Sequence, residues 1–191
     1  MNISNKSHYY FILHATVLVW GFTGVLGKLI NMPSQIIVLD RMLVAFLSLL
    51  IFWYFKNENE VISNSSRCQM LFVGLITAAH WTTFFEALKV SNVSVTLCCL
   101  SSCSFFVALI EPVFLKTKVK PYELFLSIFV IAGISIIFAF ENKYSLGIIL
   151  SIISALLAAL FSVWNAMLIK ENSSHSIALY NMLGGVLAMT I

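Results

Sequence analysis

The chain has 191 residues, of which 60% are hydrophobic and 10% are charged, and its mean hydropathy is +0.97. Soluble domains carry about a quarter charged residues, so this composition excludes a water-soluble globular protein. The net charge of +3 is too small to indicate nucleic-acid binding, and the basic residues stand singly or in short groups between apolar runs. We therefore predict an all-α membrane protein, a multi-pass helical bundle.

Seven apolar runs match the roughly 20 residues that a helix needs to cross the hydrocarbon core of a bilayer. In chain order they cover residues 9–30, 36–55, 70–89, 93–115, 122–140, 146–169 and 176–191. The first run exceeds a signal-peptide core, usually about 7–15 residues long, so we predict a retained helix. The last run would form only about 24 Å of helix, so we expect the sequence to stop inside a helix.

Two prolines mark a helix start and a bend within this pattern. Pro121, followed by Glu123, suits the first turn of a helix, where proline loses no hydrogen bond and an acidic side chain faces the helix dipole favourably. Pro112 lies near the end of the fourth run and removes one backbone donor. We predict a bend at Pro112.

The distribution of basic residues predicts the orientation, because cytoplasmic loops carry an excess of lysine and arginine. With the N-terminus in the cytoplasm, seven basic residues fall on the inner side and four on the outer side. The inner ones are Lys6, Lys56, Arg67, Lys116, Lys118, Lys120 and Lys170, and the outer ones are Lys28, Arg41, Lys89 and Lys143. We therefore predict a cytoplasmic N-terminus.

An internal repeat relates the two ends of the chain. Val19-Trp20 is echoed by Val163-Trp164, and residues 34–47 share six identities with residues 174–187 at a constant offset of 140. The matching pairs are Ser34 with Ser174, Ile37 with Ile177, Leu39 with Leu179, Met42 with Met182, Leu43 with Leu183, and Leu47 with Leu187. A shared bias towards leucine and isoleucine is the alternative explanation. A true period of five helices, an odd number, would insert the second copy upside down in the membrane.

Ionisable side chains inside the predicted spans indicate a solute pathway, because they are costly in lipid unless they face an interior. His80, Trp81 and Glu86 lie in the third run, and Arg41 lies early in the second. Two interpretations of Glu86 stay open. Glu86 lies with His80 on a substrate or proton path, or it pairs with Lys89 or Arg41 near the surface.

Small polar residues are dense in the fourth run, which includes Cys98, Cys99, Ser102 and Cys103. Such residues let helices approach closely and line an interior. A thiolate metal site is the alternative, but the cysteines have neither paired motifs nor histidines at a fixed spacing. We expect helix packing, with no disulfide framework, no metal and no cofactor.

Glycines predict close helix contacts in two further places. They repeat every three residues at Gly21, Gly24 and Gly27, and they stand together as Gly184-Gly185 in the last run. Without a side chain, each lets a neighbouring helix approach.

Four short motifs follow one another in a fixed order. They are Trp20-Gly21 in the first run, Arg41 in the second, Ala87-Leu88 at the end of the third, and Ala132-Gly133-Ile134 in the fifth. With these motifs the chain resembles EamA-type permeases of the drug/metabolite transporter superfamily. It departs from that family at Ser102-Cys103, where a proline is usual, and near residues 116–118, where an acidic residue is usual.

The resemblance implies ten helices in two inverted five-helix halves, with both ends in the cytoplasm. On this interpretation residues 1–143 form the first EamA-like repeat, with about five transmembrane helices. Residues 144–191 begin the second repeat with one helix and part of another, so that repeat is incomplete. The chain would then be truncated after about seven of ten helices.

The resemblance also implies a permease, and not an enzyme, that moves a small metabolite or drug-like solute across the cytoplasmic membrane by alternating access. We expect the pathway to be lined by Trp20, Arg41, His80, Trp81, Glu86, Cys98, Ser102 and Trp164. The indole rings of Trp20 and Trp164 would form flat apolar walls. Arg41 would hold an anionic group, and His80 or Glu86 would carry a coupling proton.

Two other classes of function stay open as alternatives. One is a non-transporting membrane component or an inactive fragment of such a permease. The other is an intramembrane enzyme using His80 and Glu86, which would need a reactive partner at matching depth that the sequence does not show. As partners we expect the lipid bilayer and a small-molecule substrate but no nucleic acid, and a homodimer is left open.

Overall fold

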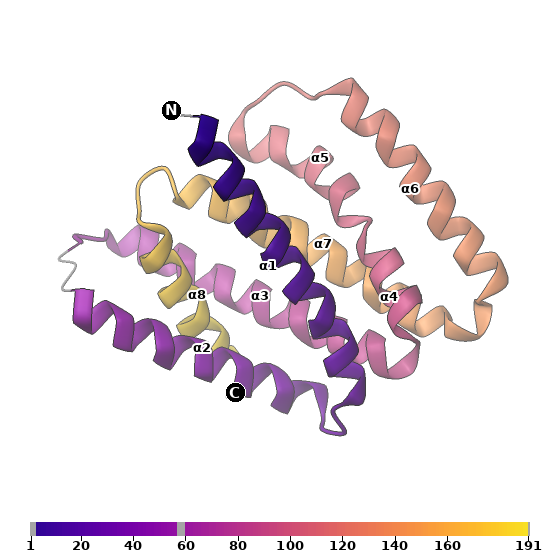
Figure 1. The fold of residues 1–191 in the computed structure, drawn as a ribbon, viewed down its shortest axis with the longest axis horizontal. Helices are drawn as coiled ribbons and strands as arrows, with labels where there is room; N and C mark the ends of the chain where they lie inside the picture. Colours follow the sequence, from indigo (N-terminus) through magenta and orange to yellow (C-terminus); the bar gives the residue numbers. More distant parts are fainter. Residues whose placement is uncertain (1–2, 57–59, 191) are drawn as a thin grey trace.

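The computed structural model describes residues 3–56 and 60–190, and the regular structure within them is helical (Figure 1). The elements are α1 (Ile3–Leu29), α2 (Ser34–Lys56), α3 (Asn64–Val90), α4 (Val93–Leu100), α5 (Cys103–Leu115), α6 (Pro121–Phe140), the short 3-10 helix η1 (Asn142–Tyr144), α7 (Ser145–Leu168) and α8 (Ser174–Met189). In these described residues, six spans are long and apolar enough to cross a membrane, with α4 and α5 counted as one. The prediction of a multi-pass helical membrane protein is confirmed.

The predicted runs coincide with helices, but some helices begin earlier than predicted. α3 starts six residues before the predicted residue 70, because the Ser63 side chain accepts a hydrogen bond from the Ser66 backbone N–H and caps the helix. α1 and α8 also begin earlier, whereas α6 begins at Pro121 with Glu123 in its first turn, as predicted. Ile191, the end of the last predicted run, lies outside the described residues.

The fourth predicted helix is interrupted at Ser101 and Ser102, where α4 ends and α5 begins. The Ser101 hydroxyl donates to the Cys98 carbonyl at 2.5 Å, and the Ser102 hydroxyl donates to the Cys99 carbonyl at 2.7 Å. Serine hydroxyls that bond the preceding turn compete with the helical pattern and bend the chain. α5 continues through Pro112 to Leu115, so the helix is interrupted at the serine pair and not at Pro112. The bend predicted at Pro112 stays a prediction.

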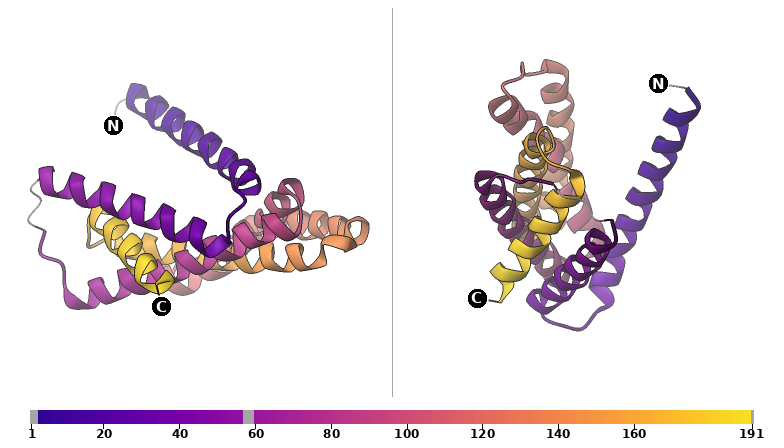
Figure 2. Two further views of the ribbon diagram at one scale, coloured as in Figure 1. Left: turned by 90° about the horizontal axis from the view of Figure 1, so that it is seen from below. Right: turned by 90° about the vertical axis from the view of Figure 1, so that its left-hand side faces the viewer.

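α3 lies in the centre of the bundle. α7 and α8 pack along it, α2 packs against α8 and α3, and α4 and α5 pack against α7 (Figure 1). α6 lies at the edge beside α5. α1 contacts α3 and α4 towards its C-terminal end, while its N-terminal end stands away from the other helices (Figure 2).

Close contacts between α3 and α8 depend on glycine. A Cβ atom at Gly184 would lie 2.2 Å from the Leu71 carbonyl oxygen, and one at Gly74 would lie 2.2 Å from the Asn181 carbonyl oxygen. The two backbones therefore touch directly, as small residues permit in membrane bundles. Along α1 the predicted contact holds at Gly27, which lies under the ring of Phe85, but nothing lies within 4 Å of a Cβ at Gly21.

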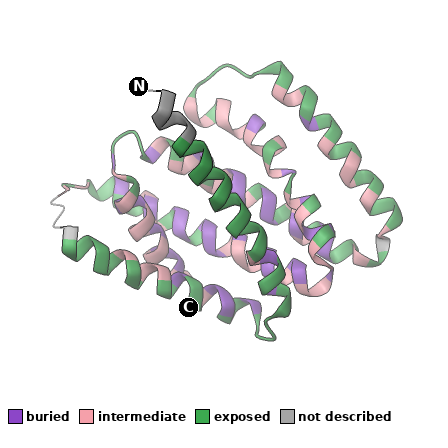
Figure 3. Ribbon diagram, in the orientation of Figure 1, coloured by how far each residue is buried: buried purple, intermediate pink, exposed green. Residues whose placement is uncertain are grey.

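The outer surface of the bundle is apolar. Buried residues gather on the facing sides of α3, α7 and α8, and most residues of α1 and α6 are exposed (Figure 3). The exposed side chains include large apolar ones such as Phe55, Phe140 and Leu29. A surface of this kind is stable against lipid, and its backbone groups are satisfied within the helices.

One end of the bundle carries the loop at residues 30–33, the turn at residues 91–92 and η1, and we call it the Lys28 end. The Lys28 ammonium group donates to the carbonyl oxygens of Leu88 at 2.6 Å, Lys89 at 3.1 Å and Ser91 at 2.7 Å. The last carbonyls of a helix have no partner within that helix and attract cations. Lys28 thus fastens the end of α1 to the end of α3.

The opposite end carries Glu60, the loop at residues 116–120 and the turn at residues 169–173, and we call it the Glu60 end. The Glu60 carboxylate accepts hydrogen bonds from the Ser173 backbone N–H at 2.8 Å and from the hydroxyls of Ser173 and Ser176. It therefore caps the N-terminus of α8, where a negative charge is stabilised. The hydrogen bond from Ser176, followed by those from Ser173, lowers the pKa of the Glu60 carboxyl, although desolvation raises it.

The two ends also separate the basic residues that we assigned to opposite sides. Arg67, Lys116, Lys118, Lys120 and Lys170 belong to the Glu60 end, and Lys28, Lys89 and Lys143 belong to the Lys28 end. Arg41, which we also assigned to the outer side, lies inside α2 and not in an end loop. The side chains of Lys6 and Lys56 lie outside the described part of the chain. Which end faces the cytoplasm stays a prediction.

Candidate functional site

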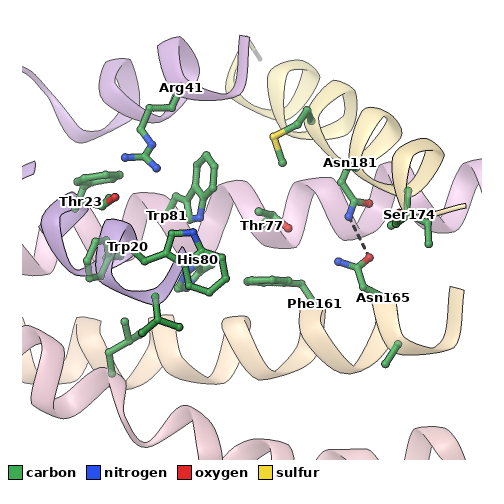
Figure 4. A pocket seen from close by; sticks show the side chains of 18 of the residues that line it. Trp20, Thr23, Arg41, Thr77, His80, Trp81, Phe161, Asn165, Ser174 and Asn181 are labelled. Atoms are coloured by element: carbon green, nitrogen blue, oxygen red, sulfur yellow. Dashed lines mark hydrogen bonds between the residues drawn. The ribbon is translucent and has the colours of Figure 1, made fainter. Parts of the chain in front are cut away.

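A cavity of about 820 Å³ lies between α1, α2, α3, α4, α7 and α8 (Figure 4). This volume falls within the range of about 300–1,000 Å³ that is typical of small-molecule sites. Its aromatic walls are formed by Trp20, Trp81, Phe84, Phe85 and Phe161. Its polar lining residues are Thr23, Arg41, Thr77, His80, Asn165, Ser174 and Asn181.

Helical periodicity explains why these side chains converge. On α3 the lining residues Thr77, Trp81 and Phe84 recur at intervals of four and three, so they occupy one face of the helix. On α7 the residues Phe161 and Asn165 lie four residues apart and share one face, which Ile169 continues at the C-cap of the helix. The two helices pack against each other, and both of these faces border the cavity.

Arg41 brings a positive charge to the cavity. Its guanidinium carbon lies 4.9 Å from the centroid of the Trp81 ring and 5.4 Å from that of Phe85. Both distances are within the range of cation–π contacts, which hold the guanidinium against the aromatic wall. Among the described lining residues, Arg41 is the only Lys, Arg, Asp or Glu, so their formal charge is positive.

His80 is fixed in orientation by Ser154 of α7. Its Nδ1 lies 2.8 Å from the Ser154 carbonyl oxygen and 2.8 Å from the Ser154 hydroxyl, which itself donates to the His80 carbonyl oxygen. A carbonyl oxygen only accepts, so Nδ1 carries the hydrogen. When the ring is neutral, Nε2 is then an acceptor, and it has no hydrogen-bond partner among the described residues. The rings of Phe84 and Phe161 lie beside the imidazole, with centroids 6.3 Å and 5.4 Å away.

The EamA-like transporter family matches residues 8–139, which is more than half of the chain. The chain belongs to the EamA-like transporter family. The predicted resemblance is thereby confirmed, and this EamA protein is a membrane transporter by family. Comparison with curated proteins and with solved structures gave no match.

Four of the eight predicted pathway residues line the cavity of this EamA protein, namely Trp20, Arg41, His80 and Trp81. Glu86 does not line it, although it lies on the same helix as His80. Its carboxylate accepts a hydrogen bond from the Ser34 hydroxyl at 2.7 Å. The ion pairs between described residues are Lys120 with Glu123 and Lys143 with Glu141, so the predicted pairing of Glu86 with Lys89 or Arg41 is not formed there.

The other three predicted residues also lie outside the cavity lining. Trp164 packs against Phe72 and Phe114, with ring centroids 5.5 Å and 5.7 Å apart, and its indole N–H donates to Gln69 at 3.2 Å. Cys98 is exposed. Ser102 is buried and bonds the turn before it. Trp164 and Ser102 therefore contribute to packing within the bundle, whereas Cys98 lies on its surface.

Sequence reasoning missed several lining residues, above all Asn165, Asn181 and Phe161. Asn165 directly follows Trp164 inside an apolar run, and Asn181 lies in the middle of the last one. An amide is costly in lipid for the same reason as a charge, so both asparagines carried a usable signal. Phe161 carried none, because aromatic residues are frequent throughout this sequence.

Proposed function

We propose that this protein is a permease that moves a small metabolite or drug-like solute across the cytoplasmic membrane by alternating access. The observation that carries the proposal is a cavity of about 820 Å³ that lies among the membrane spans of an EamA-family chain. The aromatic walls match flat apolar groups, and Arg41 matches an anionic group.

The two ends of the bundle differ in how firmly α1 is held. Alternating access requires such a difference, because one end of the pathway must be closed while the other is open. At the Lys28 end, α1 is tied to α3 by the three hydrogen bonds of Lys28 and by the contact of Gly27 with Phe85. At the Glu60 end, α1 stands away from the bundle, and the lining residues Ile169 and Ser174 belong to that end (Figure 2). These contacts support a state that is closed at the Lys28 end and accessible from the Glu60 end, which we assign to the cytoplasm.

Solute exchange across a membrane tests the proposal. Purified protein is reconstituted into liposomes, and counterflow of naphthalene-2-sulfonate is measured, because this flat anion stays charged and crosses bilayers poorly. We expect exchange above that of protein-free liposomes, and we expect Arg41→Met to raise the KM at least tenfold, since an anion then loses its countercharge (about 1.4 kcal/mol per tenfold). Arg67→Met removes an exposed arginine that does not line the cavity and serves as the matched control.

If the wild-type protein exchanges no more solute than empty liposomes, the permease proposal fails. A non-transporting membrane component then becomes the better explanation.

Proton coupling provides a second test, because the two candidate proton carriers occupy different places. His80 lines the cavity and Glu86 does not. We therefore expect His80→Gln to abolish the response of exchange to a pH gradient, and Glu86→Gln to retain it. The reverse result, with the response lost only in Glu86→Gln, would assign the proton to Glu86.

A further inference from the structure

Two asparagines form a buried amide pair at one end of the cavity. The Asn181 amide nitrogen donates to the Asn165 amide oxygen at 3.0 Å, joining α8 to α7. Asn181 is 4% exposed, and its own amide oxygen has no hydrogen-bond partner in the described structure. An amide that is buried in this way is costly, so the pair needs an explanation beyond packing.

The hydrogen bond between the two amides determines which atom of Asn165 faces the cavity. Because the Asn165 oxygen accepts from Asn181, the Asn165 nitrogen is turned away from Asn181. Figure 4 shows this nitrogen on the side of Phe161, facing the cavity. This nitrogen donates to none of the described residues. The cavity therefore contains a neutral N–H donor that is held in place but not used.

The position of the pair relates it to Arg41. The repeat offset of 140 residues that matches Met42 with Met182 also matches Arg41 with Asn181. Arg41 and the asparagine pair lie at opposite ends of the cavity, with aromatic side chains between them (Figure 4). The cavity thus offers a charged donor at one end and a neutral donor at the other.

We propose that Asn165 donates a hydrogen bond to the transported solute and that Asn181 is its positioning residue. The solute class that fits is flat and mainly apolar, with an anionic group at the Arg41 end and a neutral acceptor, such as a carbonyl oxygen, at the other. A cation does not fit, because the described lining residues include no carboxylate. This assignment rests on the proposed function, since it assumes that the cavity holds the solute.

Two matched probes test the assignment. They are 6-acetylnaphthalene-2-sulfonate and 6-isopropenylnaphthalene-2-sulfonate, which differ by a carbonyl oxygen in place of a CH2 group. Their affinities for the purified protein are measured by calorimetric titration. A neutral hydrogen bond contributes about fivefold in affinity, so we expect the wild-type protein to prefer the acetyl probe by about fivefold.

Three variants then separate the roles. Asn165→Leu removes the donor without adding a charge to the cavity, so we expect it to abolish the preference while both probes still bind. Asn181→Leu leaves Asn165 unpositioned, so we expect it to lower the preference while the isopropenyl probe still binds. Asn172→Leu replaces another buried asparagine, which bonds the Leu168 carbonyl and does not line the cavity, and should leave the fivefold preference unchanged.

The following outcomes would contradict the role of Asn165, the solute cavity, or both. A wild-type protein that binds both probes equally overturns the role of Asn165 and leaves the permease proposal intact. A fivefold preference that survives in Asn165→Leu overturns the role of Asn165 as well. A wild-type protein that binds neither probe overturns the solute cavity itself, and the role of Asn165 with it.

Discussion

The contact between α3 and α8 predicts that adding a single methyl group strongly destabilises the folded protein. In Gly184→Ala the new Cβ would lie 2.2 Å from the Leu71 carbonyl oxygen and 2.8 Å from the Leu71 Cα and carbonyl carbon. Ordinary contacts require more than 3 Å, so one backbone must move by about 1 Å. Neither partner is a flexible side chain, so we place the cost of overpacking near the upper end of its range, about 3 kcal/mol.

The same substitution favours a helix, because alanine is about 1 kcal/mol better than glycine in a helix interior. The net loss in the free energy of unfolding is therefore about 2 kcal/mol, or a fall of about 4–8 °C in Tm. Gly133→Ala is the matched control, since nothing lies within 4 Å of its Cβ on α6, and it should raise Tm slightly. Tm is measured in detergent micelles by thermal denaturation. Equal Tm values for Gly184→Ala and Gly133→Ala would refute the direct backbone contact between α3 and α8.

Two further predictions concern the two ends of the bundle. Lys28→Met removes three hydrogen bonds to the end of α3 and should lower the free energy of unfolding by about 1–2 kcal/mol. The control Lys118→Met replaces an exposed lysine and should change the free energy of unfolding by less than about 0.5 kcal/mol. An equal effect of the two substitutions would show that the Lys28 contacts do not hold α1. The folded-state pKa of Glu60 is lowered, so the stability that its carboxylate contributes is present above the unfolded pKa of about 4.5 and is lost as the pH falls through the folded pKa. Thermal denaturation between about pH 3 and pH 6 should therefore show an acid-dependent loss of stability that is smaller in Glu60→Gln, and identical pH profiles would contradict the capping role.

The amino-acid sequence by itself determined the membrane class and the positions of the helices. The reason is local: spans need about 20 apolar residues, and the breaks between them contain proline, serine, asparagine and charge. For α7 the predicted residues 146–169 and the observed Ser145–Leu168 differ by one residue at each end. Where the boundaries moved, as at α3, a side-chain cap extended the helix beyond its apolar core.

The broken fourth span shows where local reasoning reached its limit. Both Pro112 and the serine pair disturb helical hydrogen bonding, and the sequence does not rank them. The structure places the interruption at Ser101 and Ser102, where hydroxyls bond the preceding turn, and leaves α5 intact across Pro112. A membrane helix tolerates proline where neighbouring groups satisfy the freed carbonyl.

Only the tertiary structure decided which residues line the cavity. Polar residues in a span must face an interior, and that rule selected Arg41 and His80, which line the cavity. It also selected Glu86, which lies on the same helix as His80 but bonds Ser34 outside the cavity lining. Which helix lies opposite each face depends on long-range packing, and this packing brings Asn165 of α7 and Asn181 of α8 together beside α3. The apolar periodicity of a single helix carries no information about its neighbours.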